Sequence, residues 1–229
     1  MRRLIAPLIF GLFGAVVLIA LGTWQVQRLQ WKQSVLADIQ ARIDAPAVAL
    51  PLKITPDQDR YLPVAVSGHL EEPTLRVLVS HRTYGAGYRL ITAMDMGARR
   101  ILVDRGFVAN EAPRVALPGT RVEFTGNLHW PQERDRFTPD NDLEANIWFA
   151  RDVPAMAAAL NTQEVLVIAR TRSFEDGPVI PLPVGIEGIP NDHLEYVVTW
   201  YGLAAVWLVM LGLFLWRMYK TTRKPAKGD

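Results

Sequence analysis

The chain has 229 residues, of which 50% are hydrophobic and 21% are charged, and it contains no cysteine. The lack of cysteine excludes disulfides and thiolate metal sites. The formal net charge of +2 combines two unlike regions, since the two ends together carry +6 and the segment between them carries −4. The pI of about 9.0 therefore comes from the ends, and it does not indicate nucleic-acid binding.

The first predicted element is a run of 21 uncharged residues, Leu4–Trp24. As a helix rising 1.5 Å per residue, the run would be about 30 Å long, which is the thickness of a hydrocarbon core. A cleaved signal peptide is the alternative, but the run is longer than a usual signal and no clear small-x-small site follows it. We therefore predict an anchor, with residues 1–27 as the first transmembrane helix.

Helical periodicity continues beyond this run. Trp24, Arg28 and Trp31 share one helix face, which is typical of an interfacial aromatic belt with a snorkelling cation. Leucine and isoleucine then recur at helical spacing as far as Ile43. Prolines and turn-forming residues follow from Pro46. We predict a helix extension and connector over residues 28–59.

Alternating apolar residues predict a β-rich domain over residues 60–170. The expected strands are 60–68, 75–79, 87–92, 100–108, 122–128, 147–150 and 165–169, and Asp152 is expected to cap a short helix over 153–160. These elements predict an α+β, mostly antiparallel, barrel-like domain between two transmembrane helices. A segment rich in proline and glycine, residues 171–192, is expected to tether the domain to the second helix.

The second transmembrane helix is predicted over residues 193–217, around the uncharged run Tyr196–Trp216. A basic tail, residues 218–229, follows it, whereas no basic residue lies between Arg172 and Tyr196. The positive-inside rule then places both termini in the cytoplasm and the domain in the periplasm. No Arg- and Ser-rich presequence precedes the first run, which favours a bacterial inner (plasma) membrane over a mitochondrial one.

Motifs for catalysis are weak throughout. Four scattered histidines form no zinc-binding pattern, and no glycine-rich phosphate loop follows a strand. Asp104 and Arg105, in an apolar strand, favour an internal ion pair over an acid–base pair. The acidic loop around Asp140 lacks the spacing of a calcium site. We therefore expect no enzymatic activity.

His193 differs from the other histidines in its position, one turn before the second apolar run. A histidine beside aromatic residues is by itself typical of an interfacial belt. However, Trp24 and Arg28 end the other predicted helix, and the two helices must reach the same depth. A haem at this level would require an imidazole ligand, an apolar slot and a cation for its propionates.

The sequence resembles the surfeit locus protein one family of membrane factors for cytochrome c oxidase assembly. The residues that carry the resemblance are Gly22, Trp24, Gln25, Arg28, Leu29, Trp31 and Lys32, then Arg60-Tyr61, Pro63, Gly68, Gly87-Tyr88 and residues 102–106, and finally Asn191, His193, Leu194, Tyr196, Thr199-Trp200 and Gly202-Leu203-Ala204. Departures from the family pattern occur at Phe107, Asp192 and Val197. None of the three departures removes a candidate ligand.

The resemblance implies a non-enzymatic role in maturing subunit I of a haem-copper oxidase, with haem a as the bound cofactor. His193 matches the histidine proposed in the family as the haem ligand, and we add Arg28, Trp24 and Trp200 from geometry and motif position. The expected partners are cytochrome c oxidase subunit I and membrane lipid, with the haem a synthesis machinery as a further candidate. The alternative is a membrane-anchored protein that stabilises an oxidase subunit without binding haem.

The predicted topology can be tested with reporter fusions. Because positively charged flanks stay on the cytoplasmic side, a green fluorescent protein fused after residue 229 should fluoresce and an alkaline phosphatase fused there should be inactive. An active phosphatase at the C-terminus would reverse the predicted orientation.

Overall fold

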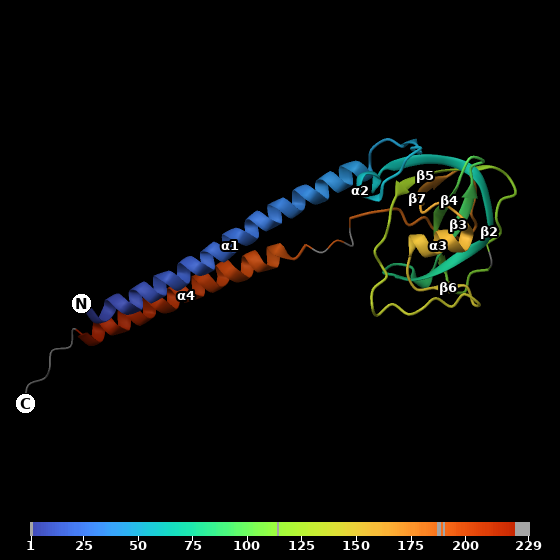
Figure 1. Ribbon diagram of the computed structural model, residues 1–229. Coiled ribbons are helices and arrows are strands. Elements are labelled where there is room, and N and C mark those ends of the chain that lie inside the picture. The colour runs from blue at the N-terminus through green and yellow to red at the C-terminus, as the bar shows by residue number, and fades with distance from the viewer. Residues whose placement is uncertain (1, 114, 187–188, 190, 223–229) are drawn as a thin grey trace, which may run out of the picture. The chain divides into compact units, whose positions relative to one another are not determined.

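The computed structural model describes residues 2–113, 115–186, 189 and 191–222. The chain divides into two compact units, one formed by its two ends and the other by Ile39–Ile186 (Figure 1). The first unit contains most of helix α1 (Arg2–Ile43) and all of helix α4 (His193–Thr222). Both helices are long and apolar enough to cross a membrane.

Glycines on α1 let α4 pack closely against it, as Figure 1 shows for the two ribbons. A Cβ atom on Gly14 would lie 2.8 Å from the Trp207 ring, and one on Gly22 would lie 2.9 Å from the Tyr201 ring. Trp207 Nε1 also donates a hydrogen bond of 2.7 Å to the Gly11 carbonyl oxygen. Small residues opposite large ones are the usual basis of helix packing in membranes, where no hydrophobic effect drives the helices together.

The contacting side chains recur at intervals of three and four residues on both helices. Gly11, Ala15, Gly22 and Gln25 are buried along α1, and Ala204 is buried on α4 between the half-buried Trp200 and Trp207. This spacing is the coiled-coil repeat, which keeps one stripe of each helix turned toward its partner. The opposite face of α1 exposes large apolar side chains such as Ile9 and Val16, as expected of a helix surrounded by lipid.

The second unit contains a single mixed sheet of seven strands among the described residues. The strands are β1 (Val48–Ala49), β2 (Pro63–His81), β3 (Gly85–Asp95), β4 (Arg100–Ala109), β5 (Val122–Leu128), β6 (Ile147–Trp148) and β7 (Leu166–Arg172), with short helices α2 (Pro56–Asp59) and α3 (Val153–Leu160). Antiparallel pairs join β2 to β3, β3 to β4, β2 to β5 and β5 to β7. Parallel pairs join β1 and β6 to β2, and β4 to β7.

The sheet is strongly curved, because the long strand β2 takes part in it twice. Residues 63–68 of β2 pair with β5, while residues 69–81 pair with β3. The curvature encloses a core to which Phe124, Leu128 and Leu166 contribute, and α3 packs Met156 and Leu160 against it. Asp152 caps α3 by accepting a hydrogen bond of 3.2 Å from the Ala155 amide, as its sequence position predicts.

This architecture confirms the predicted fold class of two apolar helices flanking a sheet-rich, mostly antiparallel domain. The prediction of separate strands on either side of Pro73 is wrong, since β2 continues through that residue. A shift in register between Glu71 and Leu75 accommodates Pro73, which has no amide hydrogen to donate to the ladder. Strand β1 and helix α2, which the sequence analysis did not predict, form within the connector.

Asp104 and Arg105 do not form the expected ion pair with each other. As neighbours on β4 they point to opposite faces of the sheet, so each is buried with other partners. The Asp104 carboxylate is 2.6 Å from Arg89 and 3.4 Å from Arg151. Arg105 forms a bidentate pair with Asp176, in which Nε donates to Oδ2 at 2.9 Å.

Asp176 lies in the segment after β7, part of which packs on the domain without forming a regular element. Ile180 exchanges two backbone hydrogen bonds with Phe107, of 2.7 and 2.8 Å, and Val179 is buried. The close approach requires Gly106, whose φ is +122° and whose Cβ would collide with the Ile180 carbonyl oxygen. Tight backbone contact and a buried ion pair together hold this segment against β4.

Replacing Arg105 with Met should destabilise the domain by about 3–5 kcal/mol, because it leaves the Asp176 carboxylate buried without a partner. Denaturant unfolding of the full chain in detergent, followed by tryptophan fluorescence, measures the loss. The matched control is Arg134→Met, which removes an exposed pair with Asp140 and should cost less than about 1 kcal/mol. Equal losses in the two variants would contradict a buried, structurally required pair.

Candidate functional site

His193, the residue expected to bind iron, is the first residue of α4 and is half-buried. Its ring contacts α1, since Nδ1 lies 2.9 Å from Oε1 of Gln25. Gln25 is 8% exposed and lies on the stripe of α1 that faces α4. The close packing of the two helices therefore brings the start of α4 to an amide in the middle of α1.

The hydrogen bond to Gln25 determines which ring nitrogen of His193 is available to a ligand. An amide oxygen can only accept, so Nδ1 carries the proton in this arrangement. The neutral ring then has its lone pair on Nε2, which is the nitrogen that a metal ion would bind. The pairing also restricts rotation of the imidazole.

Trp200 is the other predicted site residue on α4, and it lies on the same face of that helix as His193. The two are seven residues apart, which is close to two helical turns, and both are half-buried. Beside them, the Tyr201 hydroxyl lies 3.1 Å from Oγ1 of Thr23 on α1. Aromatic rings of α4 thus continue the contact with α1 beyond the histidine.

Trp24 and Arg28 lie on a different face of α1. Trp24 precedes Gln25 and so is turned about 100° away from it, and its side chain is 52% exposed. Arg28 is also exposed, with its guanidinium 4.5 Å from the ring of Trp31. The structure shows no contact between His193 and either residue.

Gln25 is the residue to which the sequence analysis assigned no role. A signal was present, because Gln25 is an amide on a stripe that otherwise carries Gly22, Leu18 and Ala15. A polar side chain on the contact face of an apolar helix points to a specific partner. A second polar group nearby is Oδ1 of Asn191, which is buried and has no hydrogen-bond partner in the part of the chain that the structure describes.

A second cluster of polar residues lies in the β domain, where Arg151 contacts two carboxylates. Its guanidinium pairs with Glu133 and lies 3.4 Å from Asp104, and its amide donates to Glu133 at 2.9 Å. Burial alone would raise the pKa of Glu133, but the hydrogen bonds and charge of Arg151 outweigh it and lower that pKa. Burial, followed by the charge of Arg151, lowers the pKa of His129 to about 4.

This network resembles a structural ion cluster more than a reaction centre. Each carboxylate in it has an arginine partner, and the His129 ring stacks on Tyr61 with centroids 5.3 Å apart. Within the described ranges, no three histidine, aspartate or glutamate side chains gather as they would around a metal ion. The contacts described in this network are therefore ion pairs and ring stacking. At the helix pair, the His193 ring bonds Gln25 through Nδ1 and presents Nε2.

The fold and the site together define a membrane protein that joins an apolar helix pair, with one histidine at its end, to a sheet-rich domain. A model of the SURF1 family matches residues 12–205, a range that begins within α1 and ends within α4. The chain belongs to the SURF1 family.

Relatives from animals and bacteria are similar over most of the chain. Surfeit locus protein 1 of Homo sapiens is 33% identical over 216 residues, covering 83% of this chain and 71% of that protein. Surfeit locus protein 1 of Gallus gallus is 32% identical over 217 residues, with 81% and 67% covered. A SURF1-like protein of Rickettsia bellii is 31% identical over 218 residues, with 90% and 87% covered.

The lowered pKa of His129 makes the stability of the domain depend on pH. The unfolded chain takes up the proton near the ordinary pKa of 6.5 and the folded domain only near 4, so stability is complete above about pH 6.5 and falls as the pH falls toward 4. After solvent screening, the loss should be about 1–2 kcal/mol. Denaturant midpoints measured between these pH values test it.

The control is His129→Phe, which keeps a ring against Tyr61 and removes the titrating group. Its stability should fall less than that of the unaltered protein over the same pH interval. Parallel pH profiles for the two proteins would show that His129 does not titrate with a lowered pKa.

Proposed function

We propose that this chain is a non-enzymatic assembly factor for a haem-copper oxidase, which binds haem a and assists its delivery to subunit I. The observation that supports this role is the histidine at the start of α4, with Nδ1 bonded to Gln25 and Nε2 available. The resemblance to an oxidase assembly family indicates the same partner. Haem a, when bound, would supply the redox iron destined for the oxidase.

The residues at the helix pair fit such a ligand. A haem iron already has four ring nitrogens and needs only one or two protein ligands, so a lone imidazole is sufficient. His193 would ligate the iron through Nε2, and the aromatic ring of Trp200 provides apolar surface on the same face of α4. The unpartnered Oδ1 of Asn191 could accept a hydrogen bond from a polar group nearby.

Gln25 acts through His193 in this proposal. By keeping the proton on Nδ1, it leaves the ligating nitrogen deprotonated and holds the ring in one orientation. Hydrogen bonds of this kind also raise the basicity of a ligating imidazole. Gln25 is thus a positioning residue.

Arg28 is proposed to pair with a propionate of the ligand. Its guanidinium is exposed, and no described carboxylate forms an ion pair with it. Trp24, one turn earlier on the same side of α1, would offer an apolar surface beside it. The proposed location is the bacterial inner membrane, with both termini cytoplasmic and the β domain periplasmic.

A second candidate is a protein that binds and stabilises an oxidase subunit without haem. The observation in its favour is the outward face of α1, where Trp24 and Trp31 are each 52% exposed. Large rings on a helix surface can pack against a helix of subunit I as readily as against a cofactor. The two candidates differ in whether the purified protein carries haem.

The test compares variants purified in detergent from cells that make haem a. His193→Ala should lose the haem or shift its Soret band, because it removes the iron ligand. Gln25→Leu should weaken haem retention by about tenfold, since it removes the partner that orients the ring. His81→Ala, on β2 of the other unit, is the matched control and should leave the spectrum unchanged.

Co-purification with subunit I separates the two candidates. If His193→Ala kept its haem content and spectrum, ligation by His193 would be refuted. Retention of subunit I by a preparation that never contains haem would favour the stabilising role instead.

A further inference from the structure

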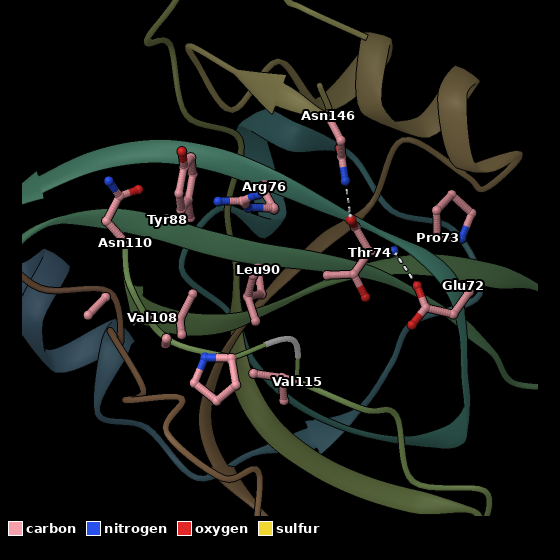
Figure 2. A pocket seen from close by; sticks show the side chains of 13 residues that line it. Glu72, Pro73, Thr74, Arg76, Tyr88, Leu90, Val108, Asn110, Val115 and Asn146 are labelled. Carbon is pink, nitrogen blue, oxygen red and sulfur yellow. Dashed lines mark hydrogen bonds between the residues drawn. The ribbon is translucent and has the colours of Figure 1, made fainter. Parts of the chain in front are cut away.

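A cavity of about 500 Å³ lies in the β domain (Figure 2), and its lining strands turn toward it the face opposite to the main core. Its floor is formed by Arg76 of β2, Tyr88 and Leu90 of β3, and Val108 of β4. Asn110, Pro113 and Val115, and the side chain of Asn146, also line it, as Figure 2 shows. The size falls within the range of pockets that bind small molecules.

Strand register places the floor residues on one side of the sheet. Arg76 pairs with Leu90, and Tyr88 pairs with Val108, so these side chains project together. The alternate residues of β2, Leu75 and Val77, point into the main core. Tyr88, Leu90 and Val108 belong to a separate, smaller apolar cluster. The cavity lies next to this cluster, which supplies its apolar wall.

Arg76 is the feature that gives this cavity a chemical preference. Its guanidinium lies 3.8 Å from the centroid of the Tyr88 ring, which holds it by a cation–π contact. No described carboxylate forms an ion pair with it, whereas Arg89, Arg105 and Arg151 of the same domain all have such partners. Arg76 is only half-buried, so its donors are within reach of a ligand.

Among the described residues that line the cavity, the polar groups around Arg76 are neutral except for Glu72. Asn146 Nδ2 donates a hydrogen bond of 2.7 Å to the Thr74 carbonyl oxygen, and Glu72 accepts one of 3.0 Å from the Thr74 amide (dashed lines in Figure 2). One planar guanidinium matches a carboxylate, to which it can donate two parallel hydrogen bonds. Arg76 is the one cation in the part of the cavity lining that the structure describes, and a monovalent carboxylate neutralises its charge whereas a phosphate dianion exceeds it.

We propose that this cavity binds a monovalent carboxylate carried on a short apolar group. The carboxylate pairs with Arg76, and the apolar group covers Leu90, Val108 and Val115. Such a carboxylate can belong to a free organic acid or to the C-terminus of a peptide. The proposal does not depend on the binding of haem by the helix pair.

The experiment titrates the full chain, in a neutral maltoside detergent, with two probes observed by saturation-transfer NMR. The probes are hexanoate and the peptide acetyl-Gly-Leu-Leu with a free C-terminus, and each is compared with its neutral amide. We expect saturable binding of the acid. Its neutral amide should bind about tenfold more weakly, because the hydrogen bonds between Arg76 and a charged carboxylate are lost. The acid that binds more tightly identifies the source of the carboxylate.

Variants assign the binding to this cavity. Arg76→Gln should weaken binding of the acid by about tenfold, and Arg76→Lys should weaken it less, since the charge remains but the paired donors are lost. Ala112→Trp should abolish binding of the acid, because the larger side chain fills the cavity while Arg76 stays in place. Arg82→Gln, an exposed arginine in the turn after β2, is the matched control and should bind normally.

Each contrary outcome is distinct from a failure of the haem proposal. Equal binding of acid and amide, unaltered binding by Arg76→Gln, or no saturable binding of either acid would overturn the carboxylate site. The haem spectrum should be the same in Arg76→Gln as in the unaltered protein. Circular dichroism of each variant verifies that the β domain is folded.

Discussion

The approach of α1 to α4 across three glycines determines the geometry of the candidate site. Gly11, Gly14 and Gly22 are each covered by a large side chain of α4, so the helices approach more closely than larger residues on α1 would allow. Hydrogen bonds at Gly11 and Thr23 then oppose sliding of one helix along the other. With the register set in this way, Gln25 meets His193 at the start of α4. The pairing of amide and imidazole follows from helix packing more than from local sequence.

In the β domain, buried charges determine how segments pack, as the glycines do for the two long helices. Strand β4 is buried on both faces, and its two central charges require partners from elsewhere in the chain. Arg89 and Arg151 supply them to Asp104, and Asp176 supplies one to Arg105. Because an unpaired buried charge costs several kcal/mol, the pairs made by Arg151 and Asp176 fix segments that have little regular structure of their own. The residues after β7 are attached to the domain in this way.

The elements that depend on local pattern were predictable from the sequence. The apolar runs gave both long helices, alternation gave most strands, and Asp152 marked the start of α3. What could not be predicted depends on contacts between distant residues. Strand alternation turns Asp104 and Arg105 to opposite faces of the sheet. Two of their partners, Arg151 and Asp176, come from segments more than 40 residues away in the chain. The continuity of β2 through Pro73 depends on pairing with β3.

The candidate site shows the same division. Sequence position singled out His193, but a helix face is needed to judge which residues can accompany it. Trp24 and Gln25 are adjacent in the chain, and the helix turns one toward α4 and the other away from it. The assembly role proposed above would require release of the ligand, which would then be held less tightly than in the acceptor. One imidazole oriented by one amide is a smaller set of contacts than an enclosed cofactor cavity, and this limited set is consistent with transfer of the ligand to another protein.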